Sequence, residues 1–223
     1  DEESSYSKYM SDAIFTLQKD VMLSDVVMAI DGLDLKISDK DMMGDVYEYC
    51  LSKLSTSKVN GQFRTPRHII NMMVEMAQPN LEDIISDPSM GSAGFLVSSA
   101  NYVMKHYKNE LMDMKRFEHF NKTMFNGYDT DPTMLRLGAM NTTLHGVASP
   151  NISYMDSVSK DNDDEMKYTL VLANPPFKGT VNDKTIHANL KAMVNTKKTE
   201  LLFVAQFIRS LQLGGRCFSI VPD

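Results

Sequence analysis

The run Asn174-Pro175-Pro176-Phe177 contains the residue types that point most directly to chemistry. It follows the apolar stretch 168–173, and two prolines directly after a strand cannot extend its hydrogen-bond ladder, so they hold a rigid, extended loop. In such a loop the Asn174 side-chain oxygen and the Pro175 carbonyl can accept hydrogen bonds from one planar amino group and direct its lone pair towards an electrophile. Phe177 can stack on the ring that carries this amine. The alternative is a turn followed by a core phenylalanine.

Three acidic residues, Asp87, Asp129 and Asp156, occupy comparable places, each directly after a predicted strand. Ligands of open α/β sheets bind beyond the carboxyl ends of the strands, so these side chains are candidates for holding one. Asp129 can bind two ribose hydroxyls, as acidic residues of dinucleotide sites do, or it can cap the helix expected from Pro132. Asp156 can accept a hydrogen bond from an adenine amino group.

Asp87 also precedes a turn rich in small residues, Gly91-Ser92-Ala93-Gly94, which leads into an expected helix. Small residues let a ligand approach the backbone, and the first turn of a helix offers free N–H groups. An acid at this place disfavours a phosphate ligand, because two anions would meet. A glycine turn of this kind can also be purely structural.

The elements that must position these residues follow an alternating pattern of strands and helices. We expect strands at residues 81–86, 123–128, 151–155, 168–173 and 216–221, the last after a Gly214-Gly215 turn, and helices at about 92–107, 132–144 and 200–213. This alternation predicts an α/β fold, a doubly wound, mostly parallel sheet covered on both faces. Residues 157–167 are expected to form an exposed loop. The first four strand ends should then surround one pocket.

Two regions are expected along the chain: a helical N-terminal segment at residues 1–60 and the catalytic domain at residues 61–223. Apolar spacing predicts an amphipathic helix over 45–54. Another helix should begin at Pro66, with Thr65 as its cap, and end before Pro79-Asn80. Because the chain stops directly after the fifth strand, we expect the domain to be incomplete at its C-terminus.

Composition narrows the classes of function. The chain has 223 residues, a formal net charge of −6, two cysteines and five histidines. No apolar stretch approaches the ~20 residues that span a bilayer, and the acidic, polar start is unlike a signal peptide, so we expect a cytoplasmic protein. The cysteines are far apart and are expected to be buried thiols, and the histidines lack ligand spacing, so we expect no metal.

One basic segment departs from the acidic balance of the chain. Residues 178–199 contain five lysines and one acid, a local charge of +4 that leaves −10 for the rest. The overall charge argues against nucleic-acid binding by the whole surface, but a local basic patch of this kind remains compatible with it.

Taken together, these features resemble the modification subunit of type I restriction-modification systems, a DNA adenine N6-methyltransferase of the gamma arrangement. The resemblance is carried, in order, by Gly61-Gln62-Phe63-Arg64-Thr65-Pro66-Arg67, by Asp87-Pro88 to Gly94-Phe95-Leu96, and by Asn174-Pro175-Pro176-Phe177. It extends through Leu135-Arg136-Leu137, Leu144-His145-Gly146, Gly214-Gly215-Arg216 and Val221-Pro222-Asp223, and so covers the chain from about residue 41.

The resemblance implies a Rossmann-like domain that binds S-adenosylmethionine and methylates adenine N6 in double-stranded DNA. By position, the residues around the cofactor's methionine part would be Gln62, Phe63, Arg64, Thr65, Pro66, Arg67, Gly91, Ser92, Ala93 and Gly94, with Asp87 on its ammonium group. Asp129 would bind the ribose and Asp156 the adenine. The target base would lie against Asn174, Pro175, Pro176 and Phe177. Two departures from the family stand out: the ribose acid is commonly Glu, and Met90 stands where Cys or Ala is frequent.

The resemblance also implies two partners, a specificity subunit that reads the DNA sequence and a restriction subunit. Related enzymes use the same chemistry on cytosine N4, RNA bases or a protein glutamine amide. Phe177, the segment 62–67 ahead of the cofactor loop and the stretch 136–146 favour DNA adenine. A further possibility is an inert fragment that binds cofactor or partners without turnover.

For the basic segment, the functional interpretation is that its lysines meet DNA phosphates beside the flipped base. The lysines concerned are Lys184, Lys191, Lys197 and Lys198. The alternative is a solvated loop. We expect the segment to be poorly ordered in the isolated chain.

Overall fold

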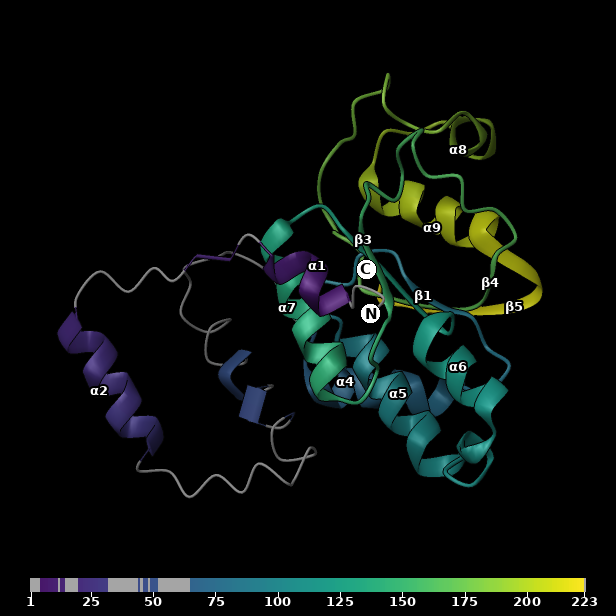
Figure 1. Cartoon of the computed structure of the whole chain (residues 1–223). Helices are drawn as coiled ribbons and strands as arrows, with labels where there is room; N and C mark the ends of the chain where they lie inside the picture. Colours follow the sequence, from purple (N-terminus) through teal and green to yellow (C-terminus); the bar gives the residue numbers. More distant parts are fainter. Residues whose placement is uncertain are drawn as a thin grey trace.

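The computed structural model of the chain describes residues 5–11, 13–14, 20–31, 44, 46–47, 49–51 and 65–222. Its described part is built on a five-stranded sheet in the order β3-β2-β1-β4-β5 (Figure 1). The strands are β1 (Ile85–Asp87), β2 (Phe125–Asp129), β3 (Asn151–Tyr154), β4 (Tyr168–Ala173) and β5 (Leu211–Ser219). Every neighbouring pair is parallel, which confirms the predicted doubly wound architecture.

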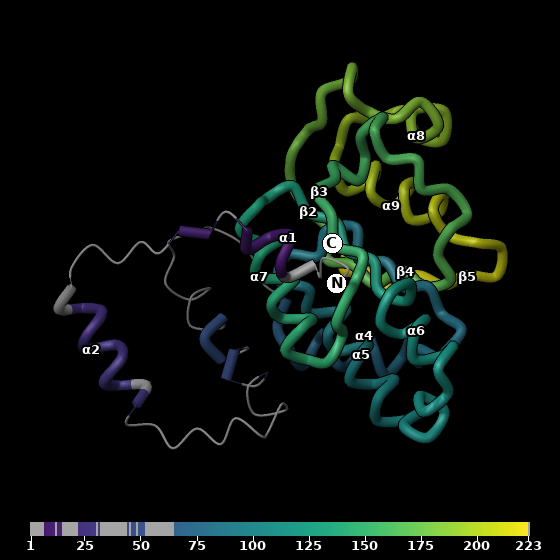
Figure 2. The backbone as a smooth tube through the Cα atoms, in the orientation of Figure 1, coloured from purple at the N-terminus to yellow at the C-terminus, as the bar shows by residue number. Residues whose placement is uncertain are grey.

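Helices cover both faces of this sheet, as Figure 1 shows. On one face lie α4 (Arg67–Ala77), α5 (Gly94–His106), α6 (Met114–Lys122) and α7 (Pro132–Leu144), which share a buried core with β1 and β2. On the other face α9 (Thr199–Ser210) forms a second core with β4, through Leu202, Phe203 and Val171. The backbone trace in Figure 2 shows α8 (Ala188–Met193) on the α9 side.

The order of the strands reverses between β1 and β4. From β1 the chain moves through β2 to β3, then returns to β4 and β5 on the other side of β1. Loops that leave β1 and β4 therefore diverge and open a crevice, which is the usual ligand site of such sheets. Ile85 pairs with Leu170 and Ser86 with Val171, so Asp87 and Asn174 emerge at the same edge.

Local sequence explains the two best-predicted elements. Strand β4 is buried along almost its whole length, as its continuous apolar sequence indicates for a strand packed on both faces. Helix α7 begins at Pro132 as predicted, and Asp131 caps it by accepting a 2.8 Å hydrogen bond from the Thr133 N–H.

Several predicted boundaries are wrong. The N-cap of α4 is Pro66 rather than Thr65, with no side-chain hydrogen bond to the first turn, whereas the end of this helix at Ala77, before a left-handed Gln78 (φ 47°), agrees with the expected end before Pro79. Strand β1 begins at Ile85, not at residue 81. Gly214 and Gly215 do not form a turn before β5 but lie within it, where Tyr168 pairs with Leu211 and Leu170 pairs only with Arg216. Residues 212–215 therefore form an irregularity in the strand.

The expected exposed loop after β3 and the expected disordered basic segment are also corrected. Ser157, Val158 and Asn162 in the loop are buried, at 2%, 2% and 1% exposure. The basic segment has defined structure: Ile186 and Leu190 are buried, and an antiparallel bridge joins Ile186 to Ser159. The prediction from sequence failed here because burial of two apolar residues, Ile186 and Leu190, is enough to dock a loop that is otherwise polar.

The N-terminal part adds helices α1 (Ser5–Met10) and α2 (Asp20–Asp31). Helix α1 packs on the outer side of α7: Tyr9 donates a 2.8 Å hydrogen bond to the Ile152 carbonyl, and its own carbonyl accepts one of 3.1 Å from Arg136. The described residues of the predicted 45–54 helix, together with residue 44, are helical. Both cysteines, expected to be buried, are exposed.

Candidate active site

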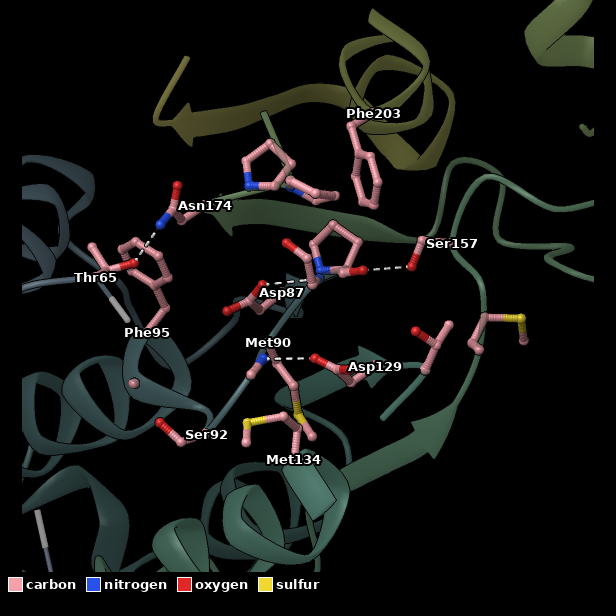
Figure 3. Close-up of a pocket in the computed structure, with 18 of the residues that line it drawn as sticks. Thr65, Asp87, Met90, Ser92, Phe95, Asp129, Met134, Ser157, Asn174 and Phe203 are labelled. Atoms are coloured by element: carbon pink, nitrogen blue, oxygen red, sulfur yellow. Dashed lines mark hydrogen bonds between the residues drawn. The ribbon is translucent and has the colours of Figure 1, made fainter. Parts of the chain in front are cut away.

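A cavity of about 610 Å³ lies at the carboxyl ends of the central strands (Figure 3). Its size falls in the range of pockets that hold a cofactor or small molecule, about 300–1,000 Å³. Asp87, Asp129, Asp156 and Asn174 all line it, so the four strand ends meet around one pocket as expected.

Asp87, the last residue of β1, lies at the bottom of the cavity. The residue is only 1% exposed, and this burial raises the pKa of the carboxyl to about 8. The hydrogen bond from the Ser89 N–H lowers the pKa and the negative charge of Asp129 raises it, and both effects are smaller than that of burial. Among the described residues no cationic side chain pairs with Asp87, and a buried carboxyl in such surroundings is favoured in its protonated form at neutral pH. A cation entering the cavity would favour its ionised form, so Asp87 is suited to an ammonium group.

The loop after β1 presents backbone to the cavity. Ala93, the N-cap of α5, has a left-handed backbone (φ 64°) and makes no side-chain cap, an uncommon conformation for a residue with a Cβ. Gly94 follows it, and a Cβ added there would lie 2.8 Å from Ile70 Cδ1, so the end of that side chain would have to shift. The first N–H groups of α5 therefore lack a side-chain partner where the loop faces the cavity.

Asp129, the last residue of β2, connects this loop to its own. One carboxylate oxygen accepts a 3.0 Å hydrogen bond from the Gly91 N–H and the other a 2.9 Å bond from the Asp131 N–H. The capping role considered for Asp129 is carried out by Asp131 instead. Asp129 is thus fixed by backbone on both oxygens while it still lines the cavity, where the remaining lone pairs can accept hydroxyl groups.

The loop after β3 forms another wall. Asp156 accepts a 3.2 Å hydrogen bond from the Val158 N–H, and Ser157 donates one of 2.6 Å to the Pro88 carbonyl, tying this loop to the loop after β1. Val158 and Phe203 of α9 line the cavity on the same side. An acidic acceptor beside apolar side chains suits a flat heterocycle with an amino group.

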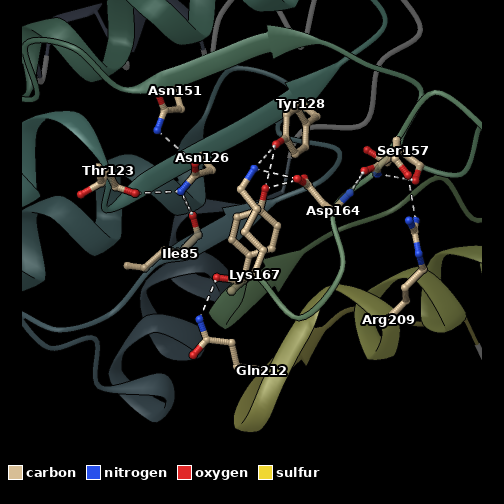
Figure 4. Close-up of polar contacts among 12 residues, drawn as sticks. Ile85, Thr123, Asn126, Tyr128, Asn151, Ser157, Asp164, Lys167, Arg209 and Gln212 are labelled. Carbon is tan, nitrogen blue, oxygen red and sulfur yellow. Dashed lines mark hydrogen bonds and ion pairs between the residues drawn. The ribbon is translucent and has the colours of Figure 1, made fainter.

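A buried polar network holds that loop in place (Figure 4). Tyr128 and Tyr168 are joined through their hydroxyls at 2.7 Å, and Tyr168 and Lys167 both donate to Asp164. Burial raises the pKa of both tyrosines, so they remain neutral donors. Farther along, Arg209 of α9 donates a 2.9 Å bond to the Asn162 carbonyl. The residues after Asp156 are therefore pinned from β2, β4 and α9.

The loop after β4 supplies an acceptor without a donor. Asn174 donates from Nδ2 to the Thr65 hydroxyl at 2.8 Å, which orients the amide. Its Oδ1 is buried and has no hydrogen-bond partner among the described residues. Pro175, Pro176 and Phe177 follow it along the cavity wall. An orphaned buried acceptor is costly, about 1–3 kcal/mol, unless a ligand satisfies it.

Met90 lines the cavity and packs between two glycines. It is 4% exposed, and a Cβ on Gly127 of β2 would clash with its sulfur, while a Cβ on Gly138 of α7 would lie 2.9 Å from its Cε. The flexible thioether fills space that the two glycines leave open. The departure from the family pattern at residue 90 is therefore accommodated by the neighbouring elements.

The other predicted site residues divide into three groups. Thr65, Gly91, Ser92 and Gly94 line the cavity, whereas Pro66, Arg67 and Ala93 do not, and Arg67 lines a smaller groove between α4 and α5. Gln62, Phe63 and Arg64 lie outside the described residues. Lys184, Lys191, Lys197 and Lys198 are exposed, and Lys191 pairs with Asp183 at 3.1 Å.

Sequence reasoning missed several residues of the cavity. Ser157 could have been found, because it follows Asp156 at a predicted strand end. Phe203 and Met134 sit within helices whose apolar spacing only indicates burial. Leu51 comes from the N-terminal segment, and no local signal links it to the site.

No group of three or more histidine, cysteine or acidic side chains among the described residues is arranged to hold a metal ion. None of the described helices is both long and apolar enough to cross a membrane.

The fold is that of the doubly wound, S-adenosylmethionine-dependent methyltransferases. A class I methyltransferase of this kind from Listeria monocytogenes, described as putative, superimposes with a TM-score of 0.62 at 19% identity over 99% of this chain and 65% of that one. The chain belongs to the N-6 DNA methylase family, whose model matches residues 38–223.

Its relatives within that family are much longer. The chain is 29% identical over 216 residues to the methylase subunit of the EcoEI type I restriction enzyme of Escherichia coli, covering 96% of this chain and 43% of that subunit. A modification subunit of a putative type I restriction enzyme from Vibrio vulnificus superimposes with a TM-score of 0.71 at 26% identity, covering 90% of this chain and 43% of that one. The chain thus spans less than half of each relative.

Proposed function

We propose that this chain is the catalytic part of a type I restriction-modification methylase that transfers a methyl group from S-adenosylmethionine to adenine N6 in DNA. The observation that carries the proposal is the orphaned Oδ1 of Asn174, a residue that lines the same cavity as Asp87, Asp129 and Asp156. Methylation of a planar amine requires a hydrogen-bond acceptor for the amine N–H next to a cavity large enough for the cofactor, and this site has both.

The residues present fit S-adenosylmethionine by their chemistry. Its ammonium group supplies the cation that the buried Asp87 lacks. Its ribose diol matches the carboxylate of Asp129, and its adenine amino group matches Asp156 beside Val158 and Phe203. The acid after β1 also argues against nucleotide phosphates in this place, since two anions would repel.

In the mechanism, the protein holds and orients more than it reacts. When bound, the cofactor supplies an electrophilic methyl group on a sulfonium. Asn174 Oδ1 and the Pro175 carbonyl accept hydrogen bonds from the target amino group and turn its lone pair towards that methyl. The apolar walls around Phe203 and Met134 exclude water from the reacting groups. Holding the amine and the methyl donor in the correct orientation can lower the activation free energy by several kcal/mol, out of the roughly 7–11 kcal/mol that ideal orientation offers.

The target base must leave the duplex to enter this cavity, because a stacked, paired amino group cannot approach a methyl donor. Phe177 then stacks on the extruded ring. The exposed lysines of the segment after Phe177 lie close in sequence to the base loop and are proposed to contact DNA phosphates. The proposal includes double-stranded DNA as the substrate, a cytoplasmic location, and a specificity subunit and a restriction subunit as partners.

The test uses the full-length protein with its specificity subunit, S-adenosylmethionine, and either DNA or RNA. Mass spectrometry of the nucleosides should show N6-methyladenine in DNA and no methylation of RNA. If methylation were found instead on cytosine N4, on RNA bases or on a protein glutamine, that group and not adenine N6 would be the acceptor. Calorimetry of cofactor binding, run on the same preparation, separates a protein that binds without turnover from one that binds nothing.

A further inference from the structure

The N-terminal segment contributes one residue to the cavity. Leu51 is 5% exposed and lines it, whereas the other described residues of the lining come from Thr65 onwards. Leu51 belongs to a run of described helical residues in which Val46, Tyr49 and Cys50 are exposed. Its burial therefore comes from the cavity and the elements around it, not from its own helix.

Two further contacts hold residues 44–51 against α7. At one end, an added Cβ on Gly44 would lie 2.7 Å from Nε2 of His145, the residue after α7, so only glycine allows this approach. In the middle, the Tyr47 hydroxyl donates a 3.2 Å hydrogen bond to the Leu137 carbonyl. At the other end Leu51 lines the cavity together with Met134 and Leu137 of α7.

Of the described residues, Gly44 therefore lies against the residue after α7, Tyr47 against the middle of α7, and Leu51 at the cavity. His145 is itself fixed, because its Nδ1 lies 2.8 Å from the Asn141 carbonyl. Figure 1 shows the coloured pieces of this segment beside α7. The segment is thus held on the same helix that forms one side of the cavity.

We propose that residues 44–51 are a side wall of the cofactor cavity, closed by Leu51, and that cofactor occupancy and docking of this wall on α7 stabilise each other. The inference rests on the proposed cofactor. An apolar side chain at the rim removes apolar area of cofactor and protein from water together. By linkage, whatever the docked wall adds to cofactor affinity, bound cofactor adds to the stability of docking.

The experiment compares Leu51→Ala with Val46→Ala in the full-length protein. Val46 is the matched control, an apolar residue on the same run that is 45% exposed. We expect Leu51→Ala to weaken S-adenosylmethionine binding about tenfold in calorimetry and Val46→Ala to stay within about twofold. Gly44→Ala, which touches no cavity atom but forces the run off His145, should weaken binding in the same direction.

Hydrogen exchange supplies a readout independent of activity. Adding S-adenosylmethionine to the unaltered protein should slow exchange of the amides of residues 44–51, and Leu51→Ala should remove most of that protection. Equal affinities for the Leu51 and Val46 variants, with exchange unaffected by cofactor, would overturn the side wall. If the unaltered protein bound no S-adenosylmethionine at all, the proposed function would fail instead.

Discussion

The proposed cofactor half of the cavity, formed by Asp87, the loop 91–94, Asp129 and Asp156, differs in its hydrogen bonding from the proposed base half, residues 174–177. Both oxygens of Asp129 accept backbone N–H groups, and the loops of the cofactor half are joined through Ser157 and Pro88. In the base half the Oδ1 of Asn174 has no partner within the described structure. The first half is preorganised, whereas the second needs a donor from its substrate, so substitutions should separate binding from transfer.

The largest effect is expected for Asn174→Ala in the full-length enzyme. Loss of the acceptor should lower the methylation rate by about a thousandfold, ~4 kcal/mol, while the affinity for S-adenosylmethionine stays within about twofold. Single-turnover methylation and calorimetry measure the two quantities. Asn174→Asp is the control, because it keeps an acceptor oxygen and should retain more activity than alanine. An equal loss of cofactor binding would show that Asn174 belongs to the cofactor half.

Asp129→Ala should have the reverse effect. It removes the acceptor for the ribose, and cofactor binding should weaken by ~1 to 3 kcal/mol, the cost of leaving polar partners unpaired. Asp131→Ala is the matched control, since it removes a carboxylate two residues away that caps α7. That variant should lose about 1 kcal/mol of stability but keep its cofactor affinity. If the two variants bound cofactor equally well, Asp129 would have only a structural role.

The pH dependence of cofactor binding tests the buried acid of the cofactor half. With the pKa of Asp87 raised from its usual 3.8 to about 8, the free protein carries a proton there at pH 6.5. An ammonium group favours the ionised form, so binding should release close to one proton and strengthen as pH rises towards 8. Calorimetry at pH 6.5 in buffers of different ionisation enthalpy measures the release, and Asp87→Asn should abolish it.

The same shift predicts how the free protein responds to pH. A folded-state pKa above the unfolded value means that ionisation of Asp87 opposes folding, so its contribution to stability falls as pH rises from about 4 to about 8. Asp87→Asn should flatten that part of the stability curve. No difference between the two curves would contradict a buried, protonated Asp87.

The smallest effects per residue are expected outside both halves, at the exposed lysines. Replacing Lys184, Lys191, Lys197 and Lys198 by Gln in the assembled enzyme should reduce the salt slope of DNA binding by about one unit each, without altering the sequence chosen. Lys191 should contribute least, because Asp183 already neutralises it. Binding across a salt series measures the slope, and an unchanged slope would favour a solvated surface with no phosphate contact.

The sequence was most informative where local rules and the fold agree. Strand β4 and helix α7 matched their predicted limits. A continuous apolar run of this length favours a buried strand, and a proline preceded by an acidic cap favours the first turn of a helix, so few other structures fit either sequence. The meeting of Asp87, Asp129, Asp156 and Asn174 followed from the topology of parallel sheets. Residues that act through tertiary contact were less accessible: Thr65 was expected to cap a helix but orients Asn174, 109 positions away.

Where local composition and packing disagreed, prediction failed. The polar character of the basic segment predicted disorder, yet Ile186 and Leu190 are buried in the core beneath α9. Gly214 and Gly215 indicated a turn but lie within β5. In both cases the local structure depends on contacts with residues that are distant in the sequence. Such contacts cannot be inferred from the local pattern of a single sequence.

The packing of Met90 against Gly127 and Gly138 fixes the order in which these residues can change over evolutionary time. A chain can exchange Met90 for a smaller residue first, because neither glycine depends on the thioether being there. The opposite order fails, since a side chain at Gly127 would overlap Met90. Residues 90 and 127 should therefore covary among related chains, with a substituent at 127 found only where residue 90 is small, whereas at 138 only the mobile end of Met90 would have to shift.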